Sequence, residues 1–147
     1  MEIWTVLIVI LVVIISLFLP RFVQYKLAER LNRNMNLNYD RMKEALEAGE
    51  DPDKRNEDGQ TVLMFIAQEG ALDVAKLLIQ HGADVNAKRK DGATALMFAA
   101  AYGKGDMVQY LIQEGANVNA KQDDGTTALD VARNSKVKQI LKDAGAA

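Results

Sequence analysis

The sequence contains no cysteine and only one histidine among its 147 residues. Without cysteine, a disulfide, a catalytic thiolate and a cysteine-ligated metal are all impossible. A single histidine, His81, argues against a zinc site and against most acid–base catalysis near neutral pH, and its place before a predicted helix end favours a structural or solvated side chain. The formal net charge of −2 shows no excess of basic residues, so nucleic acid is not an expected partner.

Sequence patterns of catalysis are also missing. There is no Ser–His–Asp set and no pair of carboxylates at catalytic spacing, and the glycine-rich stretch 103–106 lacks the Gly-Lys-Ser/Thr ending of a phosphate loop. We therefore expect no enzyme, no cofactor, no metal site and no small-molecule substrate.

One long apolar run is present at the start of the chain. Between Ile3 and Leu19 only Thr5 and Ser16 are polar. At about 1.5 Å per helical residue, this run nearly spans a hydrocarbon core of about 30 Å. Trp4 and Arg21 flank it where interfacial anchors are expected. The pattern predicts a single transmembrane helix within residues 1–23.

The alternative of a cleaved signal peptide is disfavoured because no basic residues precede the run and no small-x-small site follows it. Four basic residues follow the run, at positions 21, 26, 30 and 33. The positive-inside rule then predicts an outside N-terminus and a cytoplasmic C-terminal part. The short, cysteine-free chain suggests a bacterial inner membrane. The less bulky positions of the helix could form a seam for a homo-oligomer, with lipid-facing filler as the alternative.

Residues 24–38 are predicted to form a juxtamembrane amphipathic helix and a linker. Val23, Leu27 and Leu31 fall one helical turn apart, and asparagines at 32, 34, 36 and 38 disfavour helix further on. This helix lies on the membrane surface or packs on the following domain, and the sequence leaves both alternatives open.

The rest of the chain repeats with a period of 33 residues. The recurring residues are Gly59, Gly92 and Gly125, Thr61, Thr94 and Thr127, and Leu63, Leu96 and Leu129. Each threonine suits a helix N-cap, with its hydroxyl accepting a backbone N–H. Gly70 and Gly103 suit the end of the first helix, and in the last unit Leu129 and Arg133 are expected one turn apart on it. Such short helices need stacked neighbours to bury a core, so a solenoid is predicted.

These marks resemble the ankyrin repeat family. The similarity covers residues 40–147 and implies an all-α solenoid of helix–turn–helix units with short β-hairpin turns after the transmembrane helix. The expected domain, 39–147, comprises a half repeat (39–56), full repeats at about 57–89 and 90–122, and a shortened capping repeat (123–147). The family's Thr-Pro-Leu-His is here Thr-Val-Leu-Met, Thr-Ala-Leu-Met or Thr-Ala-Leu-Asp, and Arg89 and Gln122 replace a usual hairpin aspartate.

The resemblance implies protein binding by the hairpin tips and the inner faces of the first helices. Our leading hypothesis is a membrane-tethered adaptor for an unidentified protein partner at the cytoplasmic face. An inhibitor or immunity-type protein that masks a toxin or enzyme is one alternative, and a structural subunit of a membrane complex is another.

The resemblance also indicates which residues face outward. In the first unit they are Arg55, Glu57, Asp58, Gln68 and Glu69, in the second Lys88, Lys90, Asp91, Ala93, Ala101 and Tyr102, and in the last Lys121, Asp123 and Asp124. Tyr102 is predicted to anchor a partner side chain. Met97 and Phe98 either complete an apolar spot beside it or pack between units, as the repeated pair Met64 and Phe65 favours.

Overall fold

The computed structural model describes residues 39–147. The predicted anchor with Trp4 and Arg21, and the predicted amphipathic segment 24–38, lie outside these residues. The chain divides after Arg41, and the unit Met42–Ala147 carries the repeats. Across residues 39–147, no helix has the length and apolar character needed to cross a membrane.

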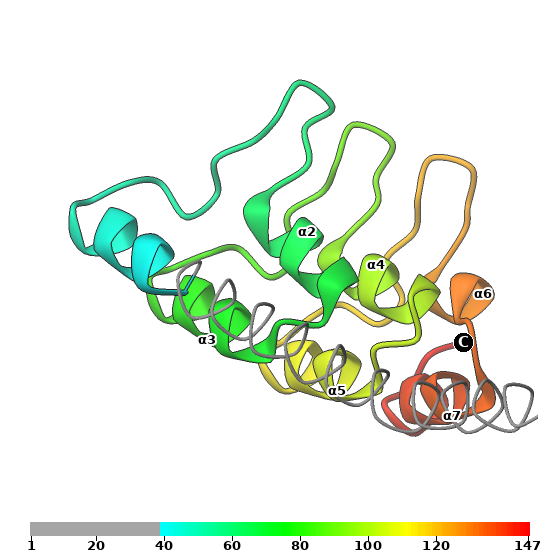
Figure 1. Ribbon diagram of the computed structural model, residues 1–147. Coiled ribbons are helices and arrows are strands. Elements are labelled where there is room, and N and C mark those ends of the chain that lie inside the picture. Colours follow the sequence, from blue (N-terminus) through cyan, green and yellow to red (C-terminus); the bar gives the residue numbers. More distant parts are fainter. Residues whose placement is uncertain (1–38) are drawn as a thin grey trace, which may run out of the picture. The chain divides into compact units, whose positions relative to one another are not determined.

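Helices come in pairs along the described chain. After a helical stretch over residues 39–47, the pairs are α2 (Val62–Glu69) with α3 (Leu72–Gln80), α4 (Ala95–Ala101) with α5 (Gly105–Gln113), and α6 (Ala128–Val131) with α7 (Ser135–Asp143). The first helices stack in the order α2, α4, α6, and each packs on the second helix of its own pair. Three hairpins, at 55–61, 88–94 and 121–127, project side by side from the start of the first helices (Figure 1).

These hairpins are turns without a sheet. In residues 39–147 the only β pairing is two isolated bridges, Arg55 with Thr61 and Lys121 with Thr127. The predicted all-α architecture of stacked helix pairs is therefore confirmed.

The core is built from the same positions of successive units. Leu63 and Leu96 are at most 1% exposed on the first helices, and Leu78 and Leu111 are fully buried on the second helices. Because these leucines recur every 33 residues, each unit presents the same apolar face to its neighbour, and the stack shares one core.

Helix starts match the sequence prediction at two units of three. The Thr61 hydroxyl accepts a hydrogen bond from Met64 N at 3.3 Å, and Thr127 forms a capping box with Asp130. The expected cap bond at Thr94 is absent: its hydroxyl is buried and has no hydrogen-bond partner among the described residues. The Thr127 hydroxyl also donates to the Asp130 carboxylate, whereas the third helical position after Thr94, like that after Thr61, is a methionine.

The first helix of the last unit is shorter than predicted. Arg133 was expected one turn after Leu129 on the same helix, and this prediction is wrong because α6 ends at Val131. Ala132 is extended, and the backbone N–H of Arg133 donates to Ala100 O on α4 at 3.0 Å. The chain thus leaves α6 early to bond with the unit before it.

A ladder of polar side chains joins the units behind the second helices. Asn86 accepts a hydrogen bond from Asn117 N at 2.7 Å and donates to Gly115 O at 3.0 Å. One unit later, Asn119 accepts from Ala147 N at 3.0 Å and donates to Gly145 O at 3.1 Å. One unit earlier the position is Asp53, whose carboxylate accepts from Asp84 N but has no N–H to donate. The side chain of the first rung therefore only accepts hydrogen bonds, whereas the side chains of the other two rungs both accept and donate.

Candidate protein-binding surface

The hairpins form a connected row. The Arg55 guanidinium donates to Gly59 O at 3.2 Å within its own hairpin and to Lys88 O at 2.7 Å in the second hairpin. The Lys90 ammonium returns the contact by donating to Glu57 O at 2.5 Å. Two basic side chains thus hold the first two hairpins in register.

The second and third hairpins meet through their backbones. Asp123 N donates to Asp91 O at 2.9 Å. Gly92, with φ of +85°, lies so close to the third hairpin that an added Cβ would be 3.0 Å from Gln122 Cα. Close backbone approach at a positive φ is a position that glycine alone suits. Hydrogen bonds between neighbouring hairpins therefore fix the backbone positions from which the exposed side chains project.

Arg55 and Lys90 were predicted as partner contacts, and both are exposed. Their hydrogen bonds to the neighbouring hairpin give each a structural role that the sequence analysis missed. Both hydrogen bonds join residues one repeat period of 33 residues apart, Arg55 with Lys88 and Lys90 with Glu57. Pairs of a basic residue and a residue one period away were therefore the sequence pattern that could have indicated this role.

The second hairpin carries an ion pair on an aromatic ring. Arg89 donates through Nε to Asp91 Oδ1 at 2.9 Å and through Nη2 to Asp91 Oδ2. Its guanidinium carbon lies 5.2 Å from the centroid of the Phe98 ring, which is cation–π distance. The hydrogen bonds from Arg89 lower the pKa of Asp91 to about 2, and the same pairing raises the pKa of Arg89. Both groups are therefore ionised at neutral pH.

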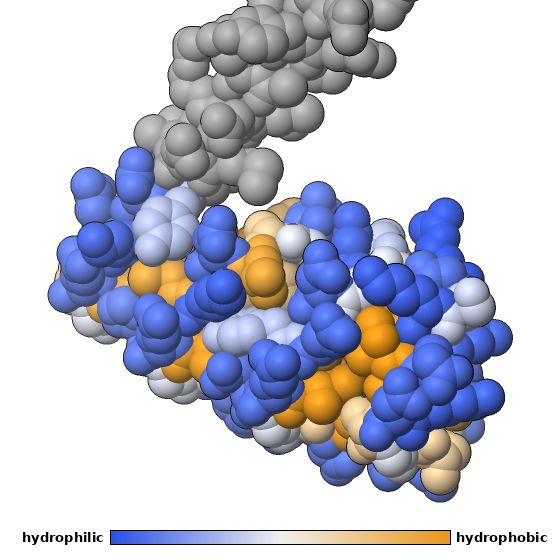
Figure 2. Space-filling view, turned by 90° about the horizontal axis from the view of Figure 1, so that it is seen from below, coloured by the Kyte–Doolittle hydropathy of each residue, from blue (hydrophilic) through white to orange (hydrophobic). Residues whose placement is uncertain are grey.

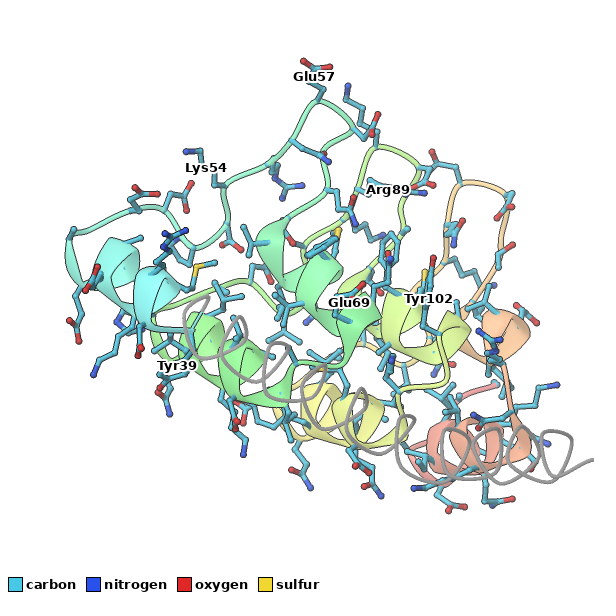
Figure 3. The ribbon with its side chains drawn as sticks, in the orientation of Figure 1. Tyr39, Lys54, Glu57, Glu69, Arg89 and Tyr102 are labelled. Atoms are coloured by element: carbon cyan, nitrogen blue, oxygen red, sulfur yellow. The ribbon has the colours of Figure 1, made fainter. Side chains whose placement is uncertain are left out.

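Aromatic side chains gather on the first helices, and we call Phe65, Phe98 and Tyr102 the aromatic patch. Phe65 is 53% exposed and Tyr102 is 47% exposed, and these are the large apolar side chains that stand most open in the described chain. Phe98 is half-buried, one turn before Tyr102 on α4 and one period after Phe65 on α2. In Figure 3, Tyr102 lies at the end of α4 beside Glu69 at the end of α2, and Arg89 lies on the hairpin above α4.

In the Met–Phe pairs, the methionines pack between units and the phenylalanines are the more exposed members. Met64 and Met97 are at most 3% exposed and pack between units, as the repetition favoured. Phe65 does not share that role, because it faces solvent. The sequence could not separate them, since a methionine and a phenylalanine side by side on a helix point in different directions.

Most of the other predicted contact residues face solvent. Ala93 does not: it is 3% exposed, so the prediction that it faces outward is wrong. Its backbone N–H donates to Asp91 and its carbonyl accepts from Arg89 N, which turns it inward between the flanking hairpins. Asp91, Gln68 and Ala101 are half-buried, and the exposed residues are Glu57, Asp58, Glu69, Lys88, Tyr102, Lys121, Asp123 and Asp124. The pKa of Asp124 is lowered by the hydrogen bonds that it accepts from Thr126.

The face formed by the second helices is less suited to a partner. Leu72, Ile79, Ile112 and Ile140 are half-buried there. Viewed from this side, the apolar surface is broken into patches by hydrophilic side chains (Figure 2). The ammonium of Lys76 lies 5.9 Å from the centroid of the Tyr110 ring and covers part of it. The surface of hairpins and first helices is therefore the stronger candidate.

The described residues offer no catalytic or metal-binding arrangement on this surface. No group of three or more histidine, aspartate or glutamate side chains is placed to hold a metal within residues 39–147. His81 ends α3, and its Nδ1 lies 3.0 Å from Leu77 O, a hydrogen-bonding distance within the same helix. The side chain is exposed, which agrees with the structural or solvated role that its position predicted.

Comparison with known proteins agrees with this geometry. The model of the family "Ankyrin repeats (3 copies)" matches residues 31–122 and 84–146. The chain belongs to the ankyrin repeat family. Ankyrin repeats are typically non-catalytic scaffolds for protein–protein interaction, which fits a firm row of hairpins carrying exposed side chains.

Among solved structures, the chain is similar to the ankyrin repeat domain of Bcl-3, described as a unique member of the IkappaB protein family. The two share 35% sequence identity with a TM-score of 0.63. The match covers 67% of this chain and 43% of the Bcl-3 chain, so this ankyrin-repeat protein spans less than half of that domain. No match is found among curated proteins.

Proposed function

We propose that this ankyrin-repeat protein is a membrane-tethered adaptor that binds a protein partner through its hairpins and first helices. The observation that carries this proposal is the exposure of Phe65 on α2 and of Tyr102 at the end of α4, 53% and 47%, on the first helices that follow the hairpins. Exposed aromatic side chains on rigid elements are frequent hot spots of protein interfaces, because they bury a large area at a small cost in side-chain entropy. The charged hairpin residues around them would form the polar rim.

The tether is inferred from the sequence. The apolar run Ile3–Leu19 is long enough to anchor the chain, and the basic residues that follow it favour a cytoplasmic ankyrin domain. A bacterial inner membrane is the proposed location. Confinement to a membrane raises the effective concentration of the domain toward other membrane-bound proteins, which strengthens binding without any new contact.

The binding surface can be tested by site-specific photocrosslinking in intact membranes. A photoreactive amino acid at position 102 should crosslink a protein partner, while the same amino acid at Tyr110, on α5, should not. Tyr102→Ala should weaken binding of the captured partner by about tenfold, or 1–2 kcal/mol, with little change in melting temperature. If binding and stability fall together, Tyr102 is a packing residue and the proposed surface is wrong.

The tether has its own test. A reporter that is active only in the cytoplasm should work when fused after Ala147, and the fusion should remain in the membrane fraction after an alkaline wash. Removing residues 1–23 should release it. Activity of an export-dependent reporter instead would reverse the proposed orientation, and a full-length protein that washes off would exclude a spanning anchor.

A further inference from the structure

Arg89 is not needed for the turn in which it lies. At the equivalent position of the first hairpin, the Asn56 side-chain oxygen accepts hydrogen bonds from Asp58 N at 3.1 Å and from Gln60 N at 2.9 Å. An arginine has no acceptor atom. In the second hairpin Asp91 supplies the acceptor instead and bonds to Ala93 N at 3.1 Å. The arginine side chain is thereby free to extend over Phe98.

The guanidinium is held on one face and one edge. Phe98 occupies a face, and the Asp91 carboxylate takes the edge formed by Nε and Nη2. An arginine has five N–H donors, so both hydrogens of Nη1 and one of Nη2 remain. Among the described residues no acceptor bonds to Nη1, and the Arg89 side chain is 31% exposed. A rigid set of open donors therefore borders the aromatic patch.

The local charge determines which acceptor fits these donors. Arg89 and Asp91 form an ion pair, so together they carry no net charge. A partner carboxylate would gain little here, because Asp91 already neutralises the guanidinium and would repel a second anion. An uncharged acceptor has no such penalty. A backbone carbonyl is the uncharged acceptor that every protein partner carries.

The fold of the partner is restricted by the same donors. Inside a helix or a central strand, backbone carbonyls already accept hydrogen bonds, whereas an extended segment leaves them open. Such a segment could place one apolar side chain on Phe98 and Tyr102, which lie one turn apart on α4. Phe65 holds the position of Phe98 on the preceding first helix, α2, and is itself exposed.

We infer that the partner presents an extended, locally uncharged peptide segment, with a backbone carbonyl bonded to Arg89 and an apolar side chain on the aromatic patch. This inference rests on the proposed binding function of the same surface. It assigns Arg89 as a specificity-determining residue and Asp91 as the group that excludes acidic segments.

Selection from a phage-displayed library of random linear peptides on the full chain in detergent micelles tests this inference. Selected peptides should share an apolar residue and no acidic one. Arg89→Lys keeps the charge but loses the planar donor edge, and it should lower the affinity for the selected synthetic peptides by about tenfold. The control Lys138→Ala, which removes an exposed cation on α7, should change binding less than twofold. Asp91→Asn should shift the selection toward acidic peptides.

An amide-to-ester scan of a selected peptide changes one peptide carbonyl at a time, and it is measured on the wild type and on the Arg89→Lys variant. One ester position should weaken binding to the wild type and have no effect on the Arg89→Lys variant, because an ester carbonyl is a weaker acceptor. Selected peptides that need an acidic residue, bind as helices or show no such ester position would overturn the inference, as would a selection that yields no binder. The proposed function would survive these results if a partner still crosslinks at position 102.

Discussion

The Asp130 carboxylate accepts two hydrogen bonds from Thr127, one from its backbone N–H at 2.8 Å and one from its hydroxyl at 2.7 Å. One unit earlier the same two positions are held by Met97 and Thr94, and the buried Thr94 hydroxyl has no partner among the described residues. The same residue type at the same position of the repeat is therefore satisfied in one unit and unsatisfied in the next.

Replacement of these threonines by valine should have opposite effects. Thr94→Val should leave the free energy of unfolding unchanged or raise it, because it removes a buried hydroxyl that has given up water without gaining a bond. Thr127→Val should lower it by about 1 kcal/mol, because it removes a helix cap. Urea unfolding followed by circular dichroism measures both. Equal losses in the two variants would show that the Thr94 hydroxyl has a partner after all.

The polar ladder predicts a stabilising substitution. Asp53→Asn supplies the N–H that the first rung lacks, so its side chain can donate toward Gly82 O as Asn86 donates to Gly115 O. It also removes a negative charge near Asp84. We expect the free energy of unfolding to rise by up to about 1 kcal/mol. Asn86→Asp is the reverse change and should lower it by a similar amount; a Asp53→Asn variant less stable than the wild type would contradict the comparison.

Alanine substitution at two glycines with the same backbone conformation distinguishes the cost of backbone strain from the cost of a steric clash with the next hairpin. Gly92 and Gly125 have φ of +85° and +87°, but an added Cβ meets the next hairpin only at Gly92. Alanine at Gly125 should cost about 1–2 kcal/mol for the left-handed backbone alone. Alanine at Gly92 should cost at least about 1 kcal/mol more, because the third hairpin must move. Thermal unfolding of the two variants measures the difference, and equal melting temperatures would mean that the hairpins are loosely stacked.

The pairing of Arg89 with Asp91 predicts a dependence of stability on acid. The pKa of Asp91 is about 2 in the folded chain and lies below its ordinary value of 3.8. The pair therefore stabilises the fold fully above about pH 4, and this contribution is lost as the pH falls toward 2. The Asp91 side chain is 43% exposed, so solvent screening limits the effect to at most about 1 kcal/mol.

Asp91→Asn should accordingly flatten the loss of stability between pH 4 and pH 2, as measured by urea unfolding at each pH. The matched control is Asp58→Asn at the equivalent position of the first hairpin, where the carboxylate accepts no hydrogen bond from the described residues. It should leave the slope of the wild type unchanged. If both variants behave as the wild type, the ion pair does not persist in solution.

The helices and the core were predictable because they depend on periodic residues. Leu63 and Leu96 are buried as their spacing indicated, since every unit repeats the same packing problem. The hairpins were less predictable because each side chain there depends on the neighbouring hairpin. Ala93 is 3% exposed although it follows a run of charged residues, and Arg55 has the sequence of a free cation although its guanidinium donates to the Lys88 carbonyl.

The candidate site shows the same limit. Exposure of Tyr102 followed from its position in the repeat, but that of Phe65 did not, because a two-residue pattern could not say which member of each Met–Phe pair faces inward. Arg89 replaces the turn acceptor Asn56 of the first hairpin, and Asp91 accepts the turn hydrogen bond instead, although an aspartate holds this position in all three hairpins. A single sequence shows that departure but not its geometry.

The polar ladder also determines how the molecule responds to mechanical load. Each rung joins a residue to one 26–31 positions later, from Asp53 to Asp84, from Asn86 to Asn117 and Gly115, and from Asn119 to Ala147 and Gly145. A pull on the C-terminus first loads the contacts of the last unit, which are the Asn119 rung, the bond from Arg133 N to Ala100 O and the packing of α6 and α7 on the unit before. The force passes to the Asn86 rung only after these contacts break. The domain should lengthen in steps of one unit, as a zipper opens from one end.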